Sequence, residues 1–526
     1  MFKNKAISET YDKIYDMVNN PAQLLIESNS KSEKINGSRE KSLKTSHPTY
    51  RLAWGKGRYI VLALCVLCFT GCRSNDITFS LTVICMNSNT SQPESIYFSP
   101  TDLSLSFAGT GAGAMIFALP AGYLLHRFGG RLVLGFSLLF SSIATLLLPT
   151  AALVAQHNDI PVSYLIFPLR CIQGFAVACV LPMVGFVSGA WSPVFEIGKF
   201  VAFLSVCSQL AQIFTMPVSA KLCVSHGWPS AFYFHGIVSL IISIIFLSFF
   251  TNSPTKHPLI GEKELSLIMS EEKRKRTGKI PYSEILRSYP VWAIWAAFLG
   301  NAFGFQLIVQ FMPTFLNKVL NVPIERTGFS AMVPPLAQIA IKTVAGVASD
   351  RITCFSEVNK LRLFNTLGMV GCGLCLVPLG YSPSDTSKAT TFAIFFFTAS
   401  ISFLGLITCG SMKSATLVAR QYAPFVMSVV QLVACIGMLI IPLLVAVLAP
   451  NNVLEEWRYV FHVVCCVLIL SNVFFCVFCD SLPAPWTKPK QTDLPLVCSS
   501  GEKNGSVGIA TGKLAEDNHH MDKNHA

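Results

Sequence analysis

The stretch Leu165-Ile-Phe-Pro-Leu-Arg-Cys-Ile-Gln-Gly-Phe-Ala-Val-Ala178 continues as an apolar run to about residue 190 and contains one charged side chain, Arg170. About 20 such residues cross the roughly 30 Å of hydrocarbon in a bilayer. An arginine inside a bilayer costs roughly 2.5–3.5 kcal/mol, so a helix keeps it where the charge faces other helices or a water-filled cavity. The stretch predicts a membrane-spanning helix in which Arg170 either contacts a passing ion or pairs inside a bundle without a ligand.

The whole chain has the composition of a membrane protein with many spans. Of its 526 residues, 52% are hydrophobic and 13% are charged, whereas soluble domains average about 25% charged residues. Runs of lipid-spanning length predict an all-α protein with twelve transmembrane helices, six before and six after a charged segment. These runs lie near 59–86, 103–125, 132–154, 163–190, 200–223 and 230–251, and then near 291–316, 328–348, 363–381, 390–411, 425–449 and 459–479.

The spans define the predicted domain organisation. A polar segment of mixed charge precedes the first span, and a segment without apolar periodicity follows the last one, which is typical of disordered tails. The predicted parts are a cytoplasmic tail at 1–57, a six-helix half at 58–251, a cytoplasmic linker at 252–290, a second six-helix half at 291–480 and a cytoplasmic tail at 481–526.

The distribution of basic residues predicts that both termini are cytoplasmic, because an excess of lysine and arginine in short loops marks that side. With the N-terminus inside, the inside loops carry Arg127, Arg131, Lys199, Arg351, Lys360, Arg362, Lys413 and Arg420, and the outside loops carry only Lys318, Arg326, Lys388 and Arg458. The formal net charge of +12 therefore indicates membrane topology and not nucleic-acid binding. The sequence Asn89-Thr-Ser in the first outside loop makes Asn89 a predicted glycosylation site.

Two segments of similar pattern occupy equivalent places in the two halves. Gly122-Tyr-Leu-Leu-His-Arg-Phe-Gly-Gly-Arg131 follows the second span, and Gly346-Val-Ala-Ser-Asp-Arg351 follows the eighth. Both resemble the signature Gly-x-x-x-Asp-Arg-x-Gly-Arg of the major facilitator superfamily, whose members are built from repeated halves. The alternative is a tight basic turn that only fixes topology. The resemblance implies a cytoplasmic gate, with histidine in place of the family's first aspartate, made of Gly122, His126, Arg127, Arg131, Asp350 and Arg351.

Longer stretches resemble one branch of that superfamily, solute carrier family 17. Examples are Gly227-Trp-Pro-Ser-Ala-Phe-Tyr-Phe-His-Gly236 and Glu455-Glu-Trp-Arg-Tyr-Val-Phe461, and the resemblance extends from about residue 58 to 486. It implies a small anion as substrate, such as phosphate, sialic acid, an acidic amino acid or a nucleotide, carried by alternating access. It also implies that the substrate is bound by Arg73, Asn75, Arg170 and Asn301.

The chain departs from this family where protons are handled. Val177 stands seven residues after Arg170, where proton-coupled members usually have glutamate, and Phe107 stands where a polar histidine or glutamate is frequent. Asp76 shares a helix face with Arg73. Asp76 either neutralises Arg73 or replaces the missing glutamate as the titrating group for coupling, since burial raises and a nearby arginine lowers the pKa of a carboxyl.

The charge inventory of the spans gives an independent indication of the substrate. Arg73, Arg170 and Lys342 are clearly intramembrane, Lys221 lies near a span end, and Asp76 is the clearly intramembrane acid. A positive bundle interior favours an anion, and an arginine fork suits carboxylate or phosphate. Lys342 either extends the basic route toward the cytoplasm or reaches the inner interface with its ammonium group.

We therefore expect a monomeric multi-pass transporter of a small anion, driven by H⁺ or Na⁺, in the plasma membrane or an endolysosomal or vesicular membrane. The alternatives are an uncoupled, voltage-driven facilitator or exchanger and a receptor or scaffold that does not transport. The residue patterns support neither an enzyme nor a cofactor or metal site, and no Gly-x-x-x-x-Gly-Lys-Ser/Thr loop for ATP occurs. The three Cys-x-x-Cys pairs lie in apolar spans and are expected to be buried thiols.

Overall fold

The computed structural model describes residues 56–86, 95–193, 196–269, 281–352, 354–383 and 385–487. The two predicted tails, apart from their residues nearest the spans, and the predicted glycosylation site Asn89 lie outside these ranges. The described residues through Thr487 belong to one compact unit. All regular secondary structure in the described ranges is helical, as the composition predicts.

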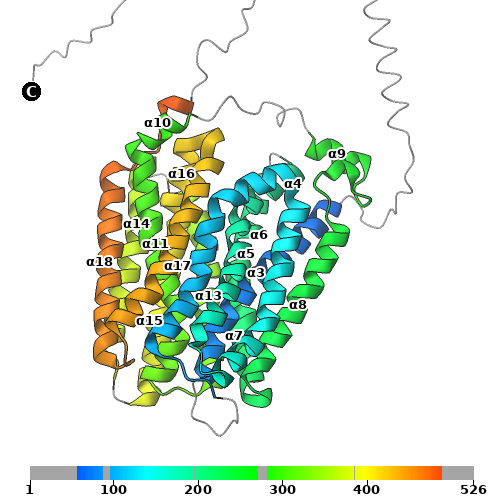
Figure 1. Ribbon diagram of the computed structural model, residues 1–526. Coiled ribbons are helices and arrows are strands. Elements are labelled where there is room, and N and C mark those ends of the chain that lie inside the picture. Colours follow the sequence, from blue (N-terminus) through cyan, green and yellow to red (C-terminus); the bar gives the residue numbers. More distant parts are fainter. Residues whose placement is uncertain are drawn as a thin grey trace, which may run out of the picture. The chain divides into compact units, whose positions relative to one another are not determined.

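The long helices follow the predicted order of spans (Figure 1). The N-terminal half contains α3 (Gly57–Met86), α4 (Pro100–His157), α5 (Val162–Trp191), α6 (Ile197–Ser205), α7 (Cys207–His226) and α8 (Trp228–Phe249). The C-terminal half contains α11 (Tyr289–Thr314), α12 (Ile324–Ala331), α13 (Val333–Arg351), α14 (Glu357–Leu376), α15 (Thr386–Gly405), α16 (Ser411–Ala419), α17 (Ala423–Leu448) and α18 (Leu454–Phe478). Between the halves lie the short helices η2 (Pro254–Lys256), α9 (Glu262–Ile268) and α10 (Tyr282–Leu286).

Helix α4 contains two of the predicted spans. It has 58 residues, and its backbone leaves the helical region at Gly129, where φ is +78°. This conformation favours glycine. The amide of Asn252 packs against Gly129, and its Oδ1 accepts a hydrogen bond from the Arg131 N–H at 2.8 Å. The kink therefore separates the second span from the third. Eleven described helical segments are long and apolar enough to cross a membrane, and they include the part of α4 from Arg127 onward. The part of α4 before the kink completes the twelve-helix arrangement.

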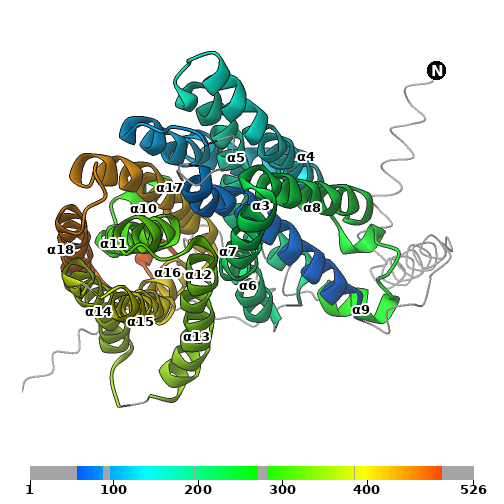
Figure 2. The same ribbon diagram turned by 90° about the horizontal axis from the view of Figure 1, so that it is seen from below.

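The N-terminal half contributes to two hydrophobic cores, one near each end of its helices. We call the end of the bundle at Gly57, α9 and α10 the linker side, and the opposite end the distal side (Figure 1). On the linker side, residues 61–72 of α3 join a core made of described residues from the N-terminal half and the linker. From Ile77 onward, α3 belongs to a larger core shared with the C-terminal half. Figure 2 shows the two groups of helices side by side.

The linker is fastened to the start of the first span. Glu264 of α9 accepts hydrogen bonds from the backbone N–H groups of Gly57 and Arg58 at 3.1 and 3.0 Å, and from Arg58 Nη1 at 3.2 Å. A carboxylate at this position stabilises the positive end of the α3 dipole. Arg58 also pairs with Glu196 at 3.1 Å, and Tyr59 donates to the same carboxylate. Burial alone would raise the pKa of Glu196, but these hydrogen bonds outweigh burial and lower it.

Candidate functional site

Arg170 lies inside the bundle with protein partners on all three nitrogens. Its Nε donates to the Ser106 carbonyl at 3.2 Å, and Nη1 donates to the Asp76 carbonyl at 3.0 Å and to Gln173 Oε1 at 2.7 Å. Nη2 pairs with Asp76 Oδ1 at 3.1 Å. The guanidinium also lies 4.8 Å from the ring centre of Phe79, and only 1% of Arg170 is exposed. In this conformation, therefore, the charge is fully engaged by the protein.

Asp76 is shared between two arginines. Besides its bond to Arg170, its other oxygen lies 3.5 Å from Arg73 Nη1. Arg73 is buried, and its Nε has no hydrogen-bond partner among the described residues. Arg73 and Asp76 sit where α3 passes from the linker-side core to the shared core. One carboxylate thus compensates two cations at the level where the two halves meet.

A polar network inside the N-terminal half supports this cluster. The Gln173 side chain accepts a hydrogen bond from Arg170 through Oε1 and donates one to Thr145 Oγ1 at 2.8 Å through Nε2. Asn75 donates to Ser141 at 3.1 Å and accepts from Ser239 at 3.0 Å. Satisfied networks of this kind hold side chains in one arrangement. Both ends of the Asn75 amide are therefore engaged in helix packing in this conformation, and its predicted role as a substrate contact stays a prediction.

A second polar group joins the two halves, and sequence reasoning singled out its lysine, Lys342, but missed its two glutamine partners. Lys342 of α13 and Gln209 of α7 face one another, and one terminal atom of the Gln209 amide lies 2.8 Å from Lys342 Nζ and 2.8 Å from Gln338 Oε1. Because an ammonium group can only donate, that atom is the Gln209 oxygen, and the Gln338 amide is then turned so that its nitrogen donates to the same oxygen. The presence of two glutamines inside apolar spans was the available signal. Asn301 of α11, the remaining predicted contact, is half-buried.

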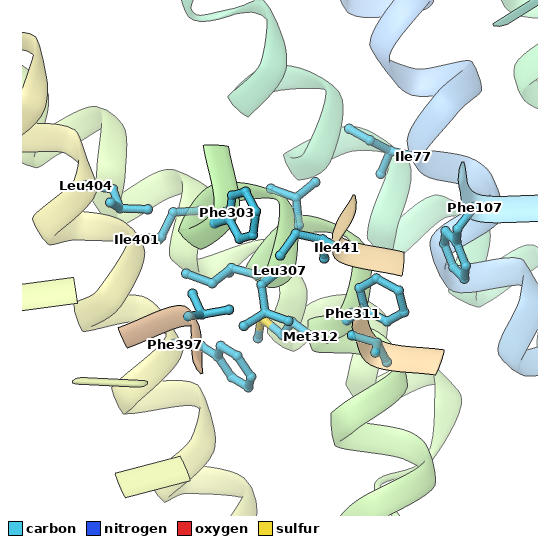
Figure 3. Packing of buried hydrophobic residues seen from close by; sticks show 14 of the residues in the cluster. Ile77, Phe107, Phe303, Leu307, Phe311, Met312, Phe397, Ile401, Leu404 and Ile441 are labelled. Atoms are coloured by element: carbon cyan, nitrogen blue, oxygen red, sulfur yellow. The ribbon is translucent and has the colours of Figure 1, made fainter. Parts of the chain in front are cut away.

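Aromatic side chains close the distal side of this region. Phe107 of α4 packs 5.0 Å from Phe79 and 5.0 Å from Phe311 of α11, measured between ring centres. Phe311 continues to Trp457 of α18 at 6.2 Å. Figure 3 shows Phe107 and Phe311 facing one another across the halves. Phe79 touches both this series and Arg170, so the charged cluster lies directly beside the closure.

The predicted gate residues form two groups at the linker side, one in each half of the protein. Arg131 follows the α4 kink, and its Nε donates to the Leu247 carbonyl at 2.6 Å, while Arg127 donates to Tyr123 at 2.9 Å on the same helix. Gly122 and His126 precede the kink on α4. Asp350 and Arg351 end α13. Arg131 thus fastens the kink to α8, and the predicted gating role of these residues stays a prediction.

Comparison with known proteins identifies the family of this bundle. The family profile described as Major Facilitator Superfamily matches residues 61–423.

The chain belongs to the Major Facilitator Superfamily.

Relatives within the superfamily agree with the resemblance to solute carrier family 17. Sialin of Ovis aries is 28% identical over 379 residues, covering 71% of this chain and 74% of sialin. Sodium-dependent phosphate transport protein 1 of Mus musculus is 27% identical over 464 residues, which cover 83% of this chain and 96% of that transporter. A solved structure titled as a bacterial homolog to the human lysosomal transporter Spinster, inward-facing and occupied, has the same fold, with a TM-score of 0.61, 13% identity and coverage of 82% and 97%. The chain is therefore a multi-pass membrane transporter and not an enzyme.

Proposed function

We propose that this protein is a secondary transporter that carries a small anion between its two six-helix halves by alternating access. The observation that carries the proposal is the sharing of Asp76 by Arg170 and Arg73, which leaves a net positive charge at the junction of the halves. A buried charge without compensation is costly, so an anion at this place is stabilised. The names of the relatives, sialin and a sodium-dependent phosphate transport protein, support the same substrate class.

Arg73 is the first contact of the anion in this proposal, and Arg170 lies behind it. The Nε of Arg73 has no hydrogen-bond partner among the described residues. Arg170, in contrast, donates hydrogen bonds to Asp76, to Gln173 and to the Ser106 carbonyl. An arriving anion replaces Asp76 on one arginine and receives a paired hydrogen bond from the fork. Release of Asp76 then links substrate binding to the position of α3.

The arrangement of the cores supports a conformation open toward the linker side. The halves share their large core on the distal side, and the linker-side core of α3 contains described residues of the N-terminal half and linker alone. With both termini cytoplasmic, as the loop charges predict, this is an inward-facing state. Rocking of the halves about the junction would open the distal side by separating Phe107 from Phe311.

The energy source is proposed to be membrane potential or exchange. Val177 is a buried apolar residue in α5, at the position where the family resemblance implies a proton-handling glutamate, and both oxygens of Asp76 are already engaged by arginines. We expect anion uptake into proteoliposomes, followed with labelled phosphate and sialic acid, to respond to voltage more than to an inward proton gradient. Replacing external Na⁺ by choline tests sodium coupling in the same assay.

The variant Asp76→Asn decides between the two roles of this carboxylate. A steep proton dependence of the wild type that disappears in Asp76→Asn would contradict the voltage-driven proposal and make Asp76 the coupling acid. Absence of saturable flux for every anion offered, in protein that is folded and inserted, would instead favour a receptor or scaffold. The variant Arg73→Gln should abolish flux while the protein still reaches the membrane.

A further inference from the structure

We propose that Lys342, together with the amides of Gln209 and Gln338, forms a second anion subsite on the C-terminal side of the junction, and that the transported substrate carries two negative charges. This inference rests on the proposed transport function and narrows its substrate class. The ligand chemistry is that of a dicarboxylate or a divalent phosphate, because both place two negative charges within one small molecule.

The charge balance of the bundle interior is the first support. Among the described residues, the charged side chains more than two helical turns, or roughly seven residues, from any helix end or from the kink at Gly129 are Arg73, Asp76, Arg170 and Lys342. Three cations and one anion leave a formal charge of 3 − 1 = +2. Such charges in a low-dielectric interior require a partner. A monovalent substrate compensates only half of this charge.

The environment of Lys342 is that of a built site. Gly405 of α15 faces the Lys342 stem, and a Cβ placed there would lie 3.2 Å from Lys342 Cγ and 3.4 Å from Gln338 Cγ. This space lets the stem cross α15 and brings Nζ to Gln209 on the other half. A neutral amide oxygen orients the ammonium group and leaves its charge uncompensated. Lys342 is therefore held toward the junction instead of reaching for the membrane surface.

Lys342 of α13 and Arg73 of α3 lie on two helices that both contact α7. Ser74, next to Arg73, shares a hydrogen bond of 2.6 Å with Thr215 of α7, and Lys342 Nζ lies 2.8 Å from the Gln209 amide of the same helix. Arg73 offers an unpartnered Nε, and an ammonium group offers three donors. A dianion that binds both cations would contact the two halves at once, because each cation belongs to a different half.

The test is uptake into proteoliposomes of full-length protein with three labelled probes at pH 7.5: succinate and inorganic phosphate as largely divalent anions, and lactate as a monovalent one. We expect the wild type to prefer at least one divalent probe over lactate. Lys342→Gln should lower uptake of that probe by about tenfold, as expected for loss of a hydrogen bond to a charged group, and should leave residual lactate uptake unchanged. Lys342→Arg should retain the preference.

Lys221→Gln is the matched control, since Lys221 is an exposed lysine near the end of α7, and it should behave as wild type. Equal or better uptake of lactate by the wild type overturns the inference while the transport proposal stands, and this result does not depend on whether Lys342→Gln folds. An equal loss of all probes in Lys342→Gln, with a normal melting temperature, also overturns it. Absence of uptake of these three probes and of labelled sialic acid by the wild type contradicts the transport proposal and this inference together.

Discussion

Arg170 shows how an intramembrane charge is made stable at the scale of one residue. Its three nitrogens donate to two carbonyls, one amide and one carboxylate, and its flat face lies over Phe79. In this conformation the Asp76 carboxylate contacts Arg170 at 3.1 Å and Arg73 at 3.5 Å, and its role as a neutralising partner or as the coupling acid stays a prediction. The shorter contact joins residues 94 positions apart, which no local spacing indicates.

We predict that Arg170→Gln lowers the free energy of unfolding by about 3–5 kcal/mol, because it leaves the buried Asp76 with only one, longer ion pair. The double variant Arg170→Gln/Asp76→Asn should recover part of this loss. Denaturant titration of purified protein in detergent micelles measures both effects as a double-mutant cycle. Strictly additive losses would show that the two side chains are not energetically coupled and would contradict this account of the cluster.

At the scale of elements, the glycines of α4 let this helix approach two neighbours closely. The second span contains Gly111-Ala-Gly-Ala. A Cβ on Gly113 would collide with the Cys171 carbonyl of α5, and one on Gly111 would lie 2.6 Å from the Leu439 nitrogen of α17. Small residues of this kind let transmembrane helices approach closely. Gly111 and Gly113 therefore serve helix packing on two sides of α4.

We predict that Gly113→Ala lowers the melting temperature by several degrees, because α4 and α5 must separate to admit the methyl group and core overpacking costs about 1–3 kcal/mol. Gly122→Ala is the matched control on the same helix. No atom outside its own helix lies within 4 Å of a Cβ at Gly122 among the described residues, and alanine favours a helix over glycine by about 0.5–1 kcal/mol. Equal melting temperatures for the two variants in detergent would contradict the packing argument.

At the scale of the whole transporter unit, the two halves are joined where their aromatic side chains meet. Phe79, Phe107, Phe311 and Trp457 run from α3 through α4 and α11 to α18, and they belong to the core shared by both halves. Alternating access requires this closure to open, so its strength sets the balance between the two conformations. Phe107 contributes a ring contact across the halves.

We predict that Phe107→Ala shifts this balance toward the state open on the distal side. Loss of the aromatic pair with Phe311 removes about 0.5–1.5 kcal/mol, which corresponds to a shift of about two- to tenfold. Hydrogen–deuterium exchange should accelerate in the distal ends of α3 and α11. Phe128→Ala, which removes an exposed ring beside the α4 kink, should leave these ends unchanged. The same exchange rates in both variants would argue against the aromatic closure.

The sequence by itself determined the class of fold, the twelve spans and the family, because these depend on hydrophobic length, on loop composition and on short motifs that are local in the chain. It also singled out Arg73, Asp76 and Arg170, since a charge is conspicuous in an apolar run. The tertiary structure alone decided which charges pair, because Arg170 and Asp76, or Lys342 and Gln209, meet only when separate helices pack together. All three side-chain nitrogens of Arg170 thus donate hydrogen bonds to the protein, while the Nε of Arg73 has no partner among the described residues. Pairing inside a bundle depends on the relative rotation and depth of its helices, and these follow from the packing of the whole unit.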